Sequence, residues 1–336
     1  MLNKKGSYGK YKRIWALISS ALVAALLVSG CGQVAPKVYH VGVLSGLSAF
    51  SPAFDGFKAK MTELGYIEGE NIIYDVQSTE VDFDAYKSIT KKFVEDKVDL
   101  IFSFPTEASV EAKAATQGTD IPVVFAMSFT DVAGLDLINS VREPGGNITG
   151  VRFPSVDIAV KRLQILLEIV PDAKRIFVPY LTGYPNVPGQ LEAIHPQAEN
   201  LGVELVEFGA ASPAELQAEM DKLSDIDAIL MIAEPLAITP PFYSILGKYS
   251  YEHNIPIGGA LMTTDGYESV FGLLPDAMQA GANAAILADK VLQGTPAGTI
   301  PVVTADSSFQ INYQAAQKLK ITIPEGLLKQ ADEIIR

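Results

Sequence analysis

The chain has 336 residues, of which 48% are apolar and 19% are charged, a composition typical of a globular protein rather than a disordered one. This length exceeds that of one ordinary core and suits two lobes. The formal net charge of −13, without a basic patch after the first dozen residues, argues against nucleic acid or an anionic membrane face as a partner.

The N-terminal segment has the pattern of an export signal. Five basic residues precede an uncharged run from Trp15 to Val28, which is shorter than the roughly 20 residues that a membrane-spanning helix needs. The letters VSGC follow and end at Cys31, the only cysteine, which resembles a bacterial lipobox with a lipid-modified cysteine. The alternative is an ordinary secretory signal with a coincidental cysteine. We expect residues 1–30 to be a lipoprotein signal peptide and residues 31–37 to be a tether.

Cleavage before Cys31 would change the charge of the chain. It would remove five basic residues and no acidic ones, which leaves 21 basic against 39 acidic residues and a net charge of −18. It would also remove the only tryptophan, and no cysteine pair could form a disulfide, so packing alone must stabilise the fold. We expect an exported, lipid-anchored protein that faces the periplasm or the cell exterior.

The first part of the mature chain alternates between buried-type apolar runs and amphipathic segments. Strand–helix alternation of this kind predicts a parallel sheet with helices on both faces. The predicted strands are 38–46, 71–77, 98–104 and 121–128, and the predicted helices are 53–65, 84–96 and 106–116.

A second copy of this pattern follows. The stretch DIPVVFAMSFTD, which begins at Asp120, is echoed by NIPIGGALMTTDG from Asn254, so that Ile121 and Ile255 are 134 positions apart. The sequence therefore predicts an α/β fold of two Rossmann-like lobes, each with a parallel sheet. The second set of strands is 175–181, 203–209, 226–233 and 255–262, and its helices are 189–202, 212–223 and 240–254.

The remaining segments connect the two lobes. A Pro/Gly-rich turn, a short strand and a linker are expected over 140–157, and a long helix over 276–294. Strands near 149–154, 269–274 and 307–312 would cross between the lobes, and three crossings would form a hinge. We expect an N-terminal lobe of residues 38–152 plus 273–304 and a C-terminal lobe of residues 153–272 plus 305–336.

The loops that follow the strands are the candidate ligand site, because ligands of open parallel sheets bind outside the carboxyl ends of the strands. Hydroxyls, aromatic rings and one carboxylate in these loops suit a small amphoteric ligand with an apolar side chain. We expect Glu234 to bind an ammonium group, although a helix-start acid stabilised by the helix dipole is an equal alternative, and the serines of the first loop also suit routine capping. The candidate ligand-binding residues are Ser48, Phe50, Ser51, Ser103, Phe104, Thr106, Ser128, Phe129, Thr130, Tyr180, Tyr184, Asn186, Glu234 and Met262.

Signals of catalysis are weak. The three histidines are far apart and lack the paired spacing of metal ligands, and no nucleophile elbow, dinucleotide-binding motif or phosphate-binding loop is present. We therefore expect a binding protein without catalytic residues, metal or cofactor.

Several segments together resemble ABC-transporter substrate-binding lipoproteins of the tryptophan-binding-protein type, within the type I periplasmic-binding-protein superfamily. They are SPAFDGFKAKMTELGYIEGENIIYD, DIPVVFA, REPGGNITGV and INYQAAQKLKITIPEGLLKQADEII. The resemblance implies two lobes joined by three hinge strands and a lipid anchor at Cys31. It also implies a monomer that delivers an aromatic or apolar amino acid, or a related compound, to an ABC permease and its ATPase.

The resemblance also carries the candidate loops into the family's ligand cleft, with departures in those loops. The usual His-Pro is Ser51-Pro52 here, and Glu107 stands after Thr106 where proline is common. A ligand sensor of the same fold, which presents its closed form to a signalling receptor, is the alternative function. An exported enzyme on this scaffold is a third possibility that the missing catalytic cluster disfavours.

Overall fold

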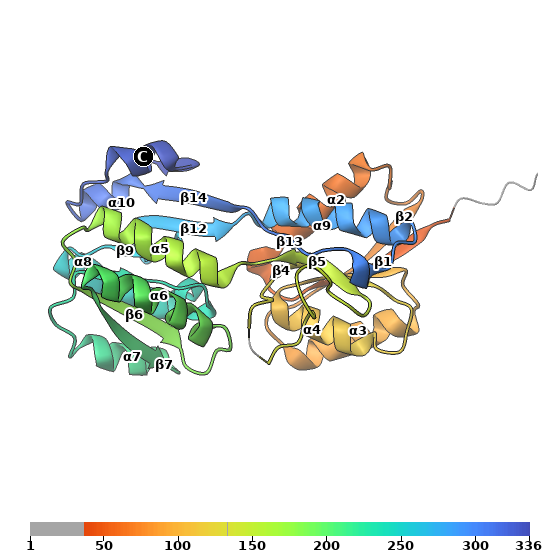
Figure 1. The fold of residues 1–336 in the computed structure, drawn as a ribbon, viewed down its shortest axis with the longest axis horizontal. Helices are drawn as coiled ribbons and strands as arrows, with labels where there is room; N and C mark the ends of the chain where they lie inside the picture. The colour runs from red at the N-terminus through yellow and green to blue at the C-terminus, as the bar shows by residue number, and fades with distance from the viewer. Residues whose placement is uncertain (1–36, 133) are drawn as a thin grey trace, which may run out of the picture. The chain divides into compact units, whose positions relative to one another are not determined.

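The computed structural model describes residues 37–132 and 134–336 (Figure 1). The expected signal peptide and Cys31 lie outside the described residues. Residues 39–336 form one compact unit that contains two large sheets and a two-stranded hairpin.

The first sheet has six strands in the order β13-β5-β4-β3-β1-β2, and every neighbouring pair is parallel. Its central strands are fully buried because helices cover both faces, which explains the near-continuous apolar runs of the sequence. The strands are β1 (Tyr39–Ser45), β2 (Ile72–Ser78), β3 (Leu100–Phe104), β4 (Val123–Ser128), β5 (Ile148–Arg152) and β13 (Val303–Thr304).

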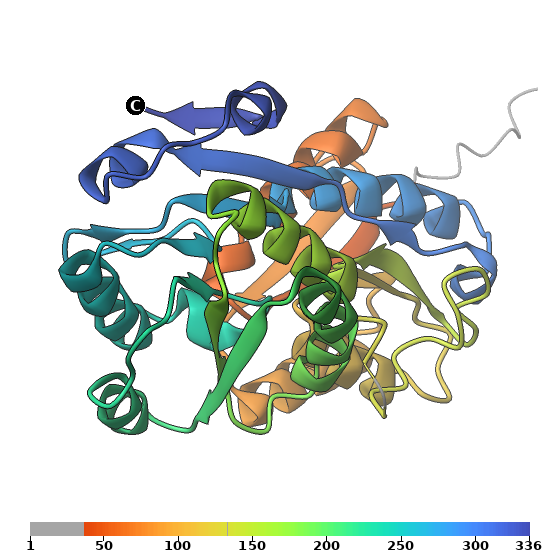
Figure 2. The same ribbon diagram turned by 60° about the vertical axis from the view of Figure 1, so that its left-hand side comes forward.

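The second sheet has seven strands in the order β15-β14-β12-β9-β8-β6-β7. The order β7-β6-β8-β9-β12 repeats the order β2-β1-β3-β4-β5 of the first sheet, so the predicted α/β fold with two parallel-sheet lobes is confirmed. Only β12 and β14 pair antiparallel. The strands are β6 (Arg175–Leu181), β7 (Glu204–Ala210), β8 (Ala228–Leu230), β9 (Ile257–Gly259), β12 (Phe271–Pro275), β14 (Ser307–Asn312) and β15 (Glu333–Ile335); Figure 2 shows β14 and β15 side by side near the C-terminus.

The helices connect successive strands. Among the described residues, none is long and apolar enough to cross a membrane. The α-helices are α2 (Pro52–Glu63), α3 (Phe83–Glu95), α4 (Thr106–Ala115), α5 (Ser155–Ile169), α6 (Val187–Leu201), α7 (Pro213–Met220), α8 (Pro240–His253), α9 (Ala277–Leu292), α10 (Tyr313–Lys318) and α11 (Glu325–Gln330), and the 3-10 helices are η1 (Ser48–Phe50), η2 (Pro235–Ile238) and η3 (Ala297–Thr299).

The linker expected to end at residue 157 is shorter than predicted, because α5 begins at Ser155, and the rest of α5 lies in a stretch for which no element was predicted. Its buried residues recur at helical spacing, and the helix packs on the second sheet. The hairpin of β10 (Thr263–Thr264) and β11 (Tyr267–Glu268) was also not predicted. A turn through Asp265 and Gly266, both at positive φ, joins its two short strands.

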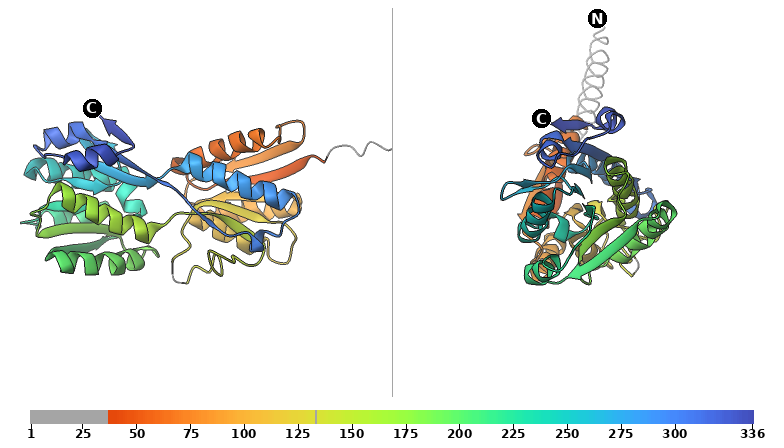
Figure 3. Two further views of the ribbon diagram at one scale, coloured as in Figure 1. Left: turned by 45° about the horizontal axis from the view of Figure 1, so that its top comes forward. Right: turned by 90° about the vertical axis from the view of Figure 1, so that its left-hand side faces the viewer.

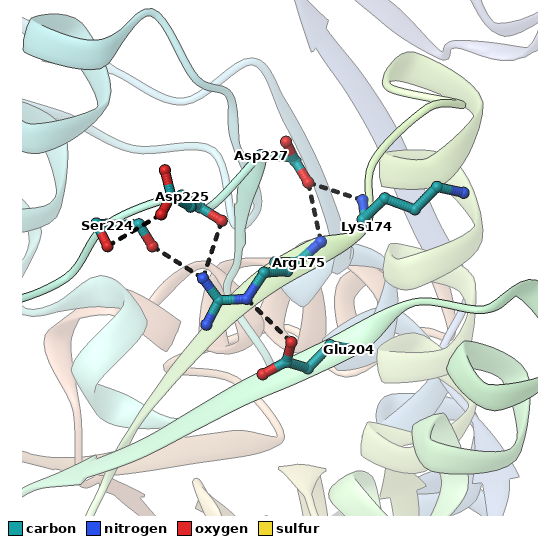
Figure 4. Close-up of polar contacts among 6 residues, drawn as sticks. All are labelled: Lys174, Arg175, Glu204, Ser224, Asp225 and Asp227. Atoms are coloured by element: carbon teal, nitrogen blue, oxygen red, sulfur yellow. Dashed lines mark hydrogen bonds and ion pairs between the residues drawn. The ribbon is translucent and has the colours of Figure 1, made fainter.

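In both lobes an aspartate carboxylate accepts backbone N–H groups at the amino ends of the strands. In the first lobe the Asp99 carboxylate accepts the N–H of His40 at 2.8 Å. In the second, Asp227 accepts the N–H groups of Lys174 and Arg175 at 2.7 and 2.9 Å (Figure 4). The predicted duplication thus extends to single side chains. The same end of the second sheet holds an ion pair between Arg175 and Glu204.

The chain crosses between the sheets at three places. It runs from β5 into α5, from β12 into α9, and from β13 into β14. Backbone hydrogen bonds hold the crossings together, from Ala305 N–H to Arg152 O at 2.9 Å and from Asp276 N–H to Asp306 O at 3.0 Å. The crossing segments therefore form one connected strap rather than three independent linkers.

After the second crossing, α9 packs directly against α2 of the first lobe. Figure 1 and the left view of Figure 3 draw the two helices side by side, α2 in orange and α9 in blue. Glycines permit this approach: a Cβ at Gly56 would lie 1.9 Å from Met278 O, and one at Gly281 would lie 1.8 Å from Ala53 O. Tyr66 adds a hydrogen bond of 2.8 Å to the Asp289 carboxylate.

Candidate functional site

The strand order locates the candidate site. In each sheet the order of strands reverses at one point, between β1 and β3 in the first lobe and between β6 and β8 in the second. Ligands of open α/β sheets bind outside the carboxyl ends of the strands at such a point. The carboxyl ends of these four strands and the segments that follow them carry nine of the sequence-predicted residues: Ser48, Phe50, Ser51, Phe104, Thr106, Tyr180, Tyr184, Asn186 and Glu234.

One contact joins these loops across the lobes. Tyr184, in the loop after β6, donates its hydroxyl to Glu107 Oε1 at 2.9 Å, and Glu107 lies in the first turn of α4. Burial raises the pKa of the Tyr184 phenol, and the negative charges of Glu107 and Glu234 raise it further. The carboxyl-end loops of the two sheets therefore face each other here, with two carboxylates near one phenol.

Glu234 is 6% exposed and lies four residues beyond the end of β8, immediately before η2. Its Oε2 accepts the N–H groups of Leu181 and Leu236, both at 3.0 Å. The bond to Leu236 is that of an acid at the start of η2, and the bond to Leu181 fastens this loop to the end of β6. The carboxylate is thus held in place by two backbone N–H donors.

Asn186 extends the same hydrogen-bond network and has one acceptor atom without a partner among the described residues. Its Nδ2 donates to Ala233 O at 2.7 Å, and Gln190 donates to that carbonyl as well at 3.0 Å. Asn186 is 3% exposed, yet its Oδ1 has no partner among the described residues. Thr130 Oγ1, in the loop after β4, is likewise a buried oxygen without a hydrogen-bond partner within 37–132 and 134–336.

Arg162 on α5 donates to two backbone carbonyls of the second lobe. It is 1% exposed and donates to Met231 O at 3.0 Å and, through Nε and Nη2, to Leu273 O at 3.1 and 2.9 Å. Burial lowers the pKa of its guanidinium to about 9, although the charge of Glu234 opposes that shift. Arg162 therefore ties the end of β8 to the crossing strand β12.

The aromatic candidates differ in exposure. Four of them are half-buried and pack against the main core: Phe50, Phe129, Tyr180 and Tyr184. The rings of Phe129 and Phe153 meet edge to face, with their centroids 5.1 Å apart. Phe104 is fully buried beside Phe102. Half-buried rings retain a face that an apolar ligand can cover.

The hydroxyl candidates also fall into different surroundings. Ser103 and Ser128 are buried, and each contacts the Ser109 hydroxyl at 3.0 Å inside the first lobe. Thr106 accepts the N–H of Phe129 at 2.9 Å and so links the loops after β3 and β4.

Three further candidates lie at the edges of the loops. Ser48 and Ser51 are exposed beside η1. Met262 is half-buried and packs against the second-lobe core. The structure thus brings the loop residues to one end of each sheet but gives several of them partners of their own.

Two residues of this region were not among the sequence candidates. Glu107 follows Thr106 directly, and its partner Tyr184 is 77 positions away. Arg162 lies between the linker expected to end at residue 157 and the strand expected to begin at residue 175, in a stretch for which no element was predicted. A charged residue within the apolar spacing of α5 was the available signal for Arg162, whereas nothing local marks Glu107.

Other parts of the described chain offer weaker sites. No group of three or more His, Cys, Asp or Glu side chains within 37–132 and 134–336 could hold a metal ion. A pocket of about 540 Å³ lies at the amino-end side of the second sheet, beside Ile169, Asp227 and Ile321. The Asp227 oxygen there already accepts two backbone N–H groups.

Comparison with known proteins identifies relatives that bind small ligands. The family described as ABC transporter substrate binding protein matches residues 41–335. A tyrosine-binding protein of Clostridioides difficile strain R20291 is 30% identical over 319 residues, which cover 89% of this chain and 89% of that protein.

Solved structures agree in fold. A ligand-free, open substrate-binding protein with adhesive properties from Clostridium difficile has a TM-score of 0.72 and 26% identity, over 89% of this chain and 99% of its own. An ABC domain from Streptococcus pneumonia in complex with L-Trp has a TM-score of 0.75 and 24% identity, and the match covers 89% of this chain and 100% of that one.

Proposed function

Because the chain belongs to the ABC transporter substrate-binding protein family, a family of binding proteins rather than enzymes, we propose that it captures an aromatic or apolar amino acid between its lobes. It then delivers this ligand to an ABC permease in the membrane. The ligand contacts the loops after β1, β3 and β4 on one side and those after β6, β8 and β9 on the other. Contact with both sets of loops at once favours the closed arrangement of the lobes.

The observation that carries this proposal is the cross-lobe pairing of Tyr184 and Glu107 at the two switch points. It supports a site in which carboxyl-end loops of both sheets reach one ligand. Half-buried rings on both sides, including Phe50, Phe129 and Tyr180, suit an apolar side chain. Asn186 Oδ1 and Thr130 Oγ1 supply acceptors that a polar ligand group would satisfy.

The names of related proteins narrow the ligand class. The relative in Clostridioides difficile is a tyrosine-binding protein, and the streptococcal structure contains L-Trp. We propose an aromatic amino acid for this chain on that basis, with export and lipid attachment through Cys31 as part of the same function. A lipid anchor would keep the loaded protein near its permease.

A thermal-shift screen of the twenty amino acids with the chain from Lys37 onward tests this function. One or more aromatic or apolar amino acids should raise the melting temperature, and the stabilisation should grow as RT ln(1 + [L]/Kd), about 2.7 kcal/mol at a ligand concentration of 100 Kd. Mass spectrometry of the protein from bacterial membranes tests the diacylglycerol mass on Cys31. If no amino acid shifts the melting temperature at millimolar concentration, the proposed ligand class is wrong.

A further inference from the structure

Glu107 has a carboxylate whose charge no cation of the described chain balances. It is half-buried, and its one hydrogen bond within 37–132 and 134–336 comes from the neutral phenol of Tyr184. No lysine or arginine of those residues forms an ion pair with it, although pairs such as Lys58–Glu68 and Arg175–Glu204 occur elsewhere in the described part of the chain. The start of α4 stabilises this carboxylate through the helix dipole, but no side-chain cation of the described residues adds to that effect.

The second lobe adds a further negative charge and an acceptor. Glu234 is held by two backbone N–H groups beneath the same loop that carries Tyr184. Both carboxylates lie close enough to Tyr184 for their charges to raise its pKa. Asn186 Oδ1, in the same loop and 3% exposed, is an acceptor without a donor among the described residues.

The donors of Arg162, a buried cation of the second lobe, are used elsewhere. Arg162 donates to Leu273 O and Met231 O. The charge of Glu234 acts on the Arg162 guanidinium and opposes the lowering of its pKa by burial. Among the described residues Glu107 therefore has no side-chain cation as a partner and Asn186 Oδ1 has no donor, and a ligand cation with N–H donors would satisfy both.

We propose that Glu107 is a specificity-determining residue that binds the ammonium group of the ligand, so that the site selects aromatic or apolar compounds carrying a positive charge over their uncharged or anionic counterparts. This inference rests on the proposed function and names the ligand group that the first lobe recognises. Tyr184 keeps the Glu107 carboxylate in place through Oε1 and leaves Oε2 for the ligand.

Two substitutions separate the charge of Glu107 from its hydrogen bond. Glu107→Gln keeps an oxygen that can accept from Tyr184 but removes the charge, whereas Tyr184→Phe removes the hydrogen bond but keeps the ring and the carboxylate. Glu111→Gln, one turn further along α4, is the matched control for loss of a negative charge on that helix. Melting temperatures of all variants without ligand show whether each one folds.

Calorimetric titration with three sets of probes provides the test. The probes are L-tyrosine and L-tryptophan, the amines tyramine and tryptamine, and the deaminated acids 3-(4-hydroxyphenyl)propanoate and 3-(indol-3-yl)propanoate. Wild type should bind the better amino acid at least 100-fold more tightly than its deaminated acid. Glu107→Gln should weaken the amino acid and the amine at least tenfold and should leave the acid unchanged or more tightly bound, while Glu111→Gln should change each affinity less than twofold.

The outcomes are distinct. Equal weakening of all three probe classes by Glu107→Gln would overturn the inference, because Glu107 would then act only through the contact with Tyr184. An unchanged affinity for the amino acid would overturn it too. Binding of amino acid and deaminated acid with similar affinity would contradict the inference but leave the proposed function intact, whereas a protein that binds none of the six probes would contradict both.

Discussion

The Tyr184 hydroxyl donates a 2.9 Å hydrogen bond to Glu107 Oε1 and thereby connects the loop after β6 to the start of α4. The two residues belong to different sheets, and each stands at the point where the strand order of its sheet reverses. We expect the Tyr184 ring to cover the bound ligand as well. Tyr184→Ala should therefore weaken amino-acid binding at least tenfold in a calorimetric titration, because both the ring and the cross-lobe bond are lost.

His195→Ala is the control for that measurement. His195 lies on α6 with its side chain half exposed, and it contacts Glu207 on β7, away from the carboxyl ends of the strands. Its replacement should leave the affinity within twofold of wild type. Comparable losses for the alanine variants of Tyr184 and His195 would contradict the site.

Arg162 should matter for stability more than any exposed cation. Arg162→Ala leaves the buried carbonyls of Met231 and Leu273 without these donors, so we expect a loss of about 3–5 kcal/mol in the free energy of unfolding. Lys161→Ala, at the exposed neighbouring position, should cost less than about 0.5 kcal/mol. Urea denaturation measures both values, and equal stability of the two variants would show that Arg162 does not bind these carbonyls.

The contact of α2 with α9 predicts a steric effect. An added Cβ at Gly281 would lie 1.8 Å from Ala53 O, whereas one at Gly326 on α11 would meet nothing within 4 Å. Gly281→Ala should therefore destabilise the protein by about 1–3 kcal/mol. Gly326→Ala should be neutral or stabilising by up to about 1 kcal/mol. Thermal unfolding of both variants checks the packing, and a neutral Gly281→Ala would contradict it.

The stability of the protein should depend on alkaline pH through its buried phenols. Burial raises the pKa of Tyr184, with added contributions from Glu107, Glu234 and Tyr86, and burial raises that of Tyr86 to about 12. Below pH 10 both phenols are protonated in the native and the unfolded state, so their contribution to stability is present in full and does not change with pH. Above pH 10 the unfolded chain loses these protons while the native state keeps them, so the free energy of unfolding falls as pH rises.

Tyr184→Phe isolates one of these groups. The difference in unfolding free energy between wild type and Tyr184→Phe should shrink between pH 8 and pH 11, because only the wild type gains stability from a protonated Tyr184. Urea denaturation across this range measures the difference. A gap that stays constant, or widens with pH, would show that the Tyr184 pKa is not raised.

Much of the fold could be predicted because the chain repeats itself. The echo of Ile121 at Ile255 and the alternation of apolar runs predicted two parallel sheets, and the strand orders confirm them. Helix α5 could not be predicted as easily, because Arg162 interrupts its apolar face with a charge that only tertiary contacts satisfy. Local pattern is a poor guide where a buried charge replaces an apolar residue.

The candidate site was only partly accessible from sequence. Loops after strands can be located by periodicity, and this places Tyr184, Asn186 and Glu234 at the carboxyl end of the second sheet. Which side chain faces the ligand depends on contacts across the fold. Ser103 and Ser128 bond to Ser109 inside their own lobe, whereas Glu107 gains its significance from a residue 77 positions away.

A crystal structure of the chain with L-tyrosine or L-tryptophan bound tests the central claim most directly. The amino acid should lie between the loops after β3 and β6, with its ammonium group within hydrogen-bond distance of Glu107 and its ring against Tyr184. Density for the amino acid only at another place, such as the pocket beside Ile169 and Asp227, would contradict the account.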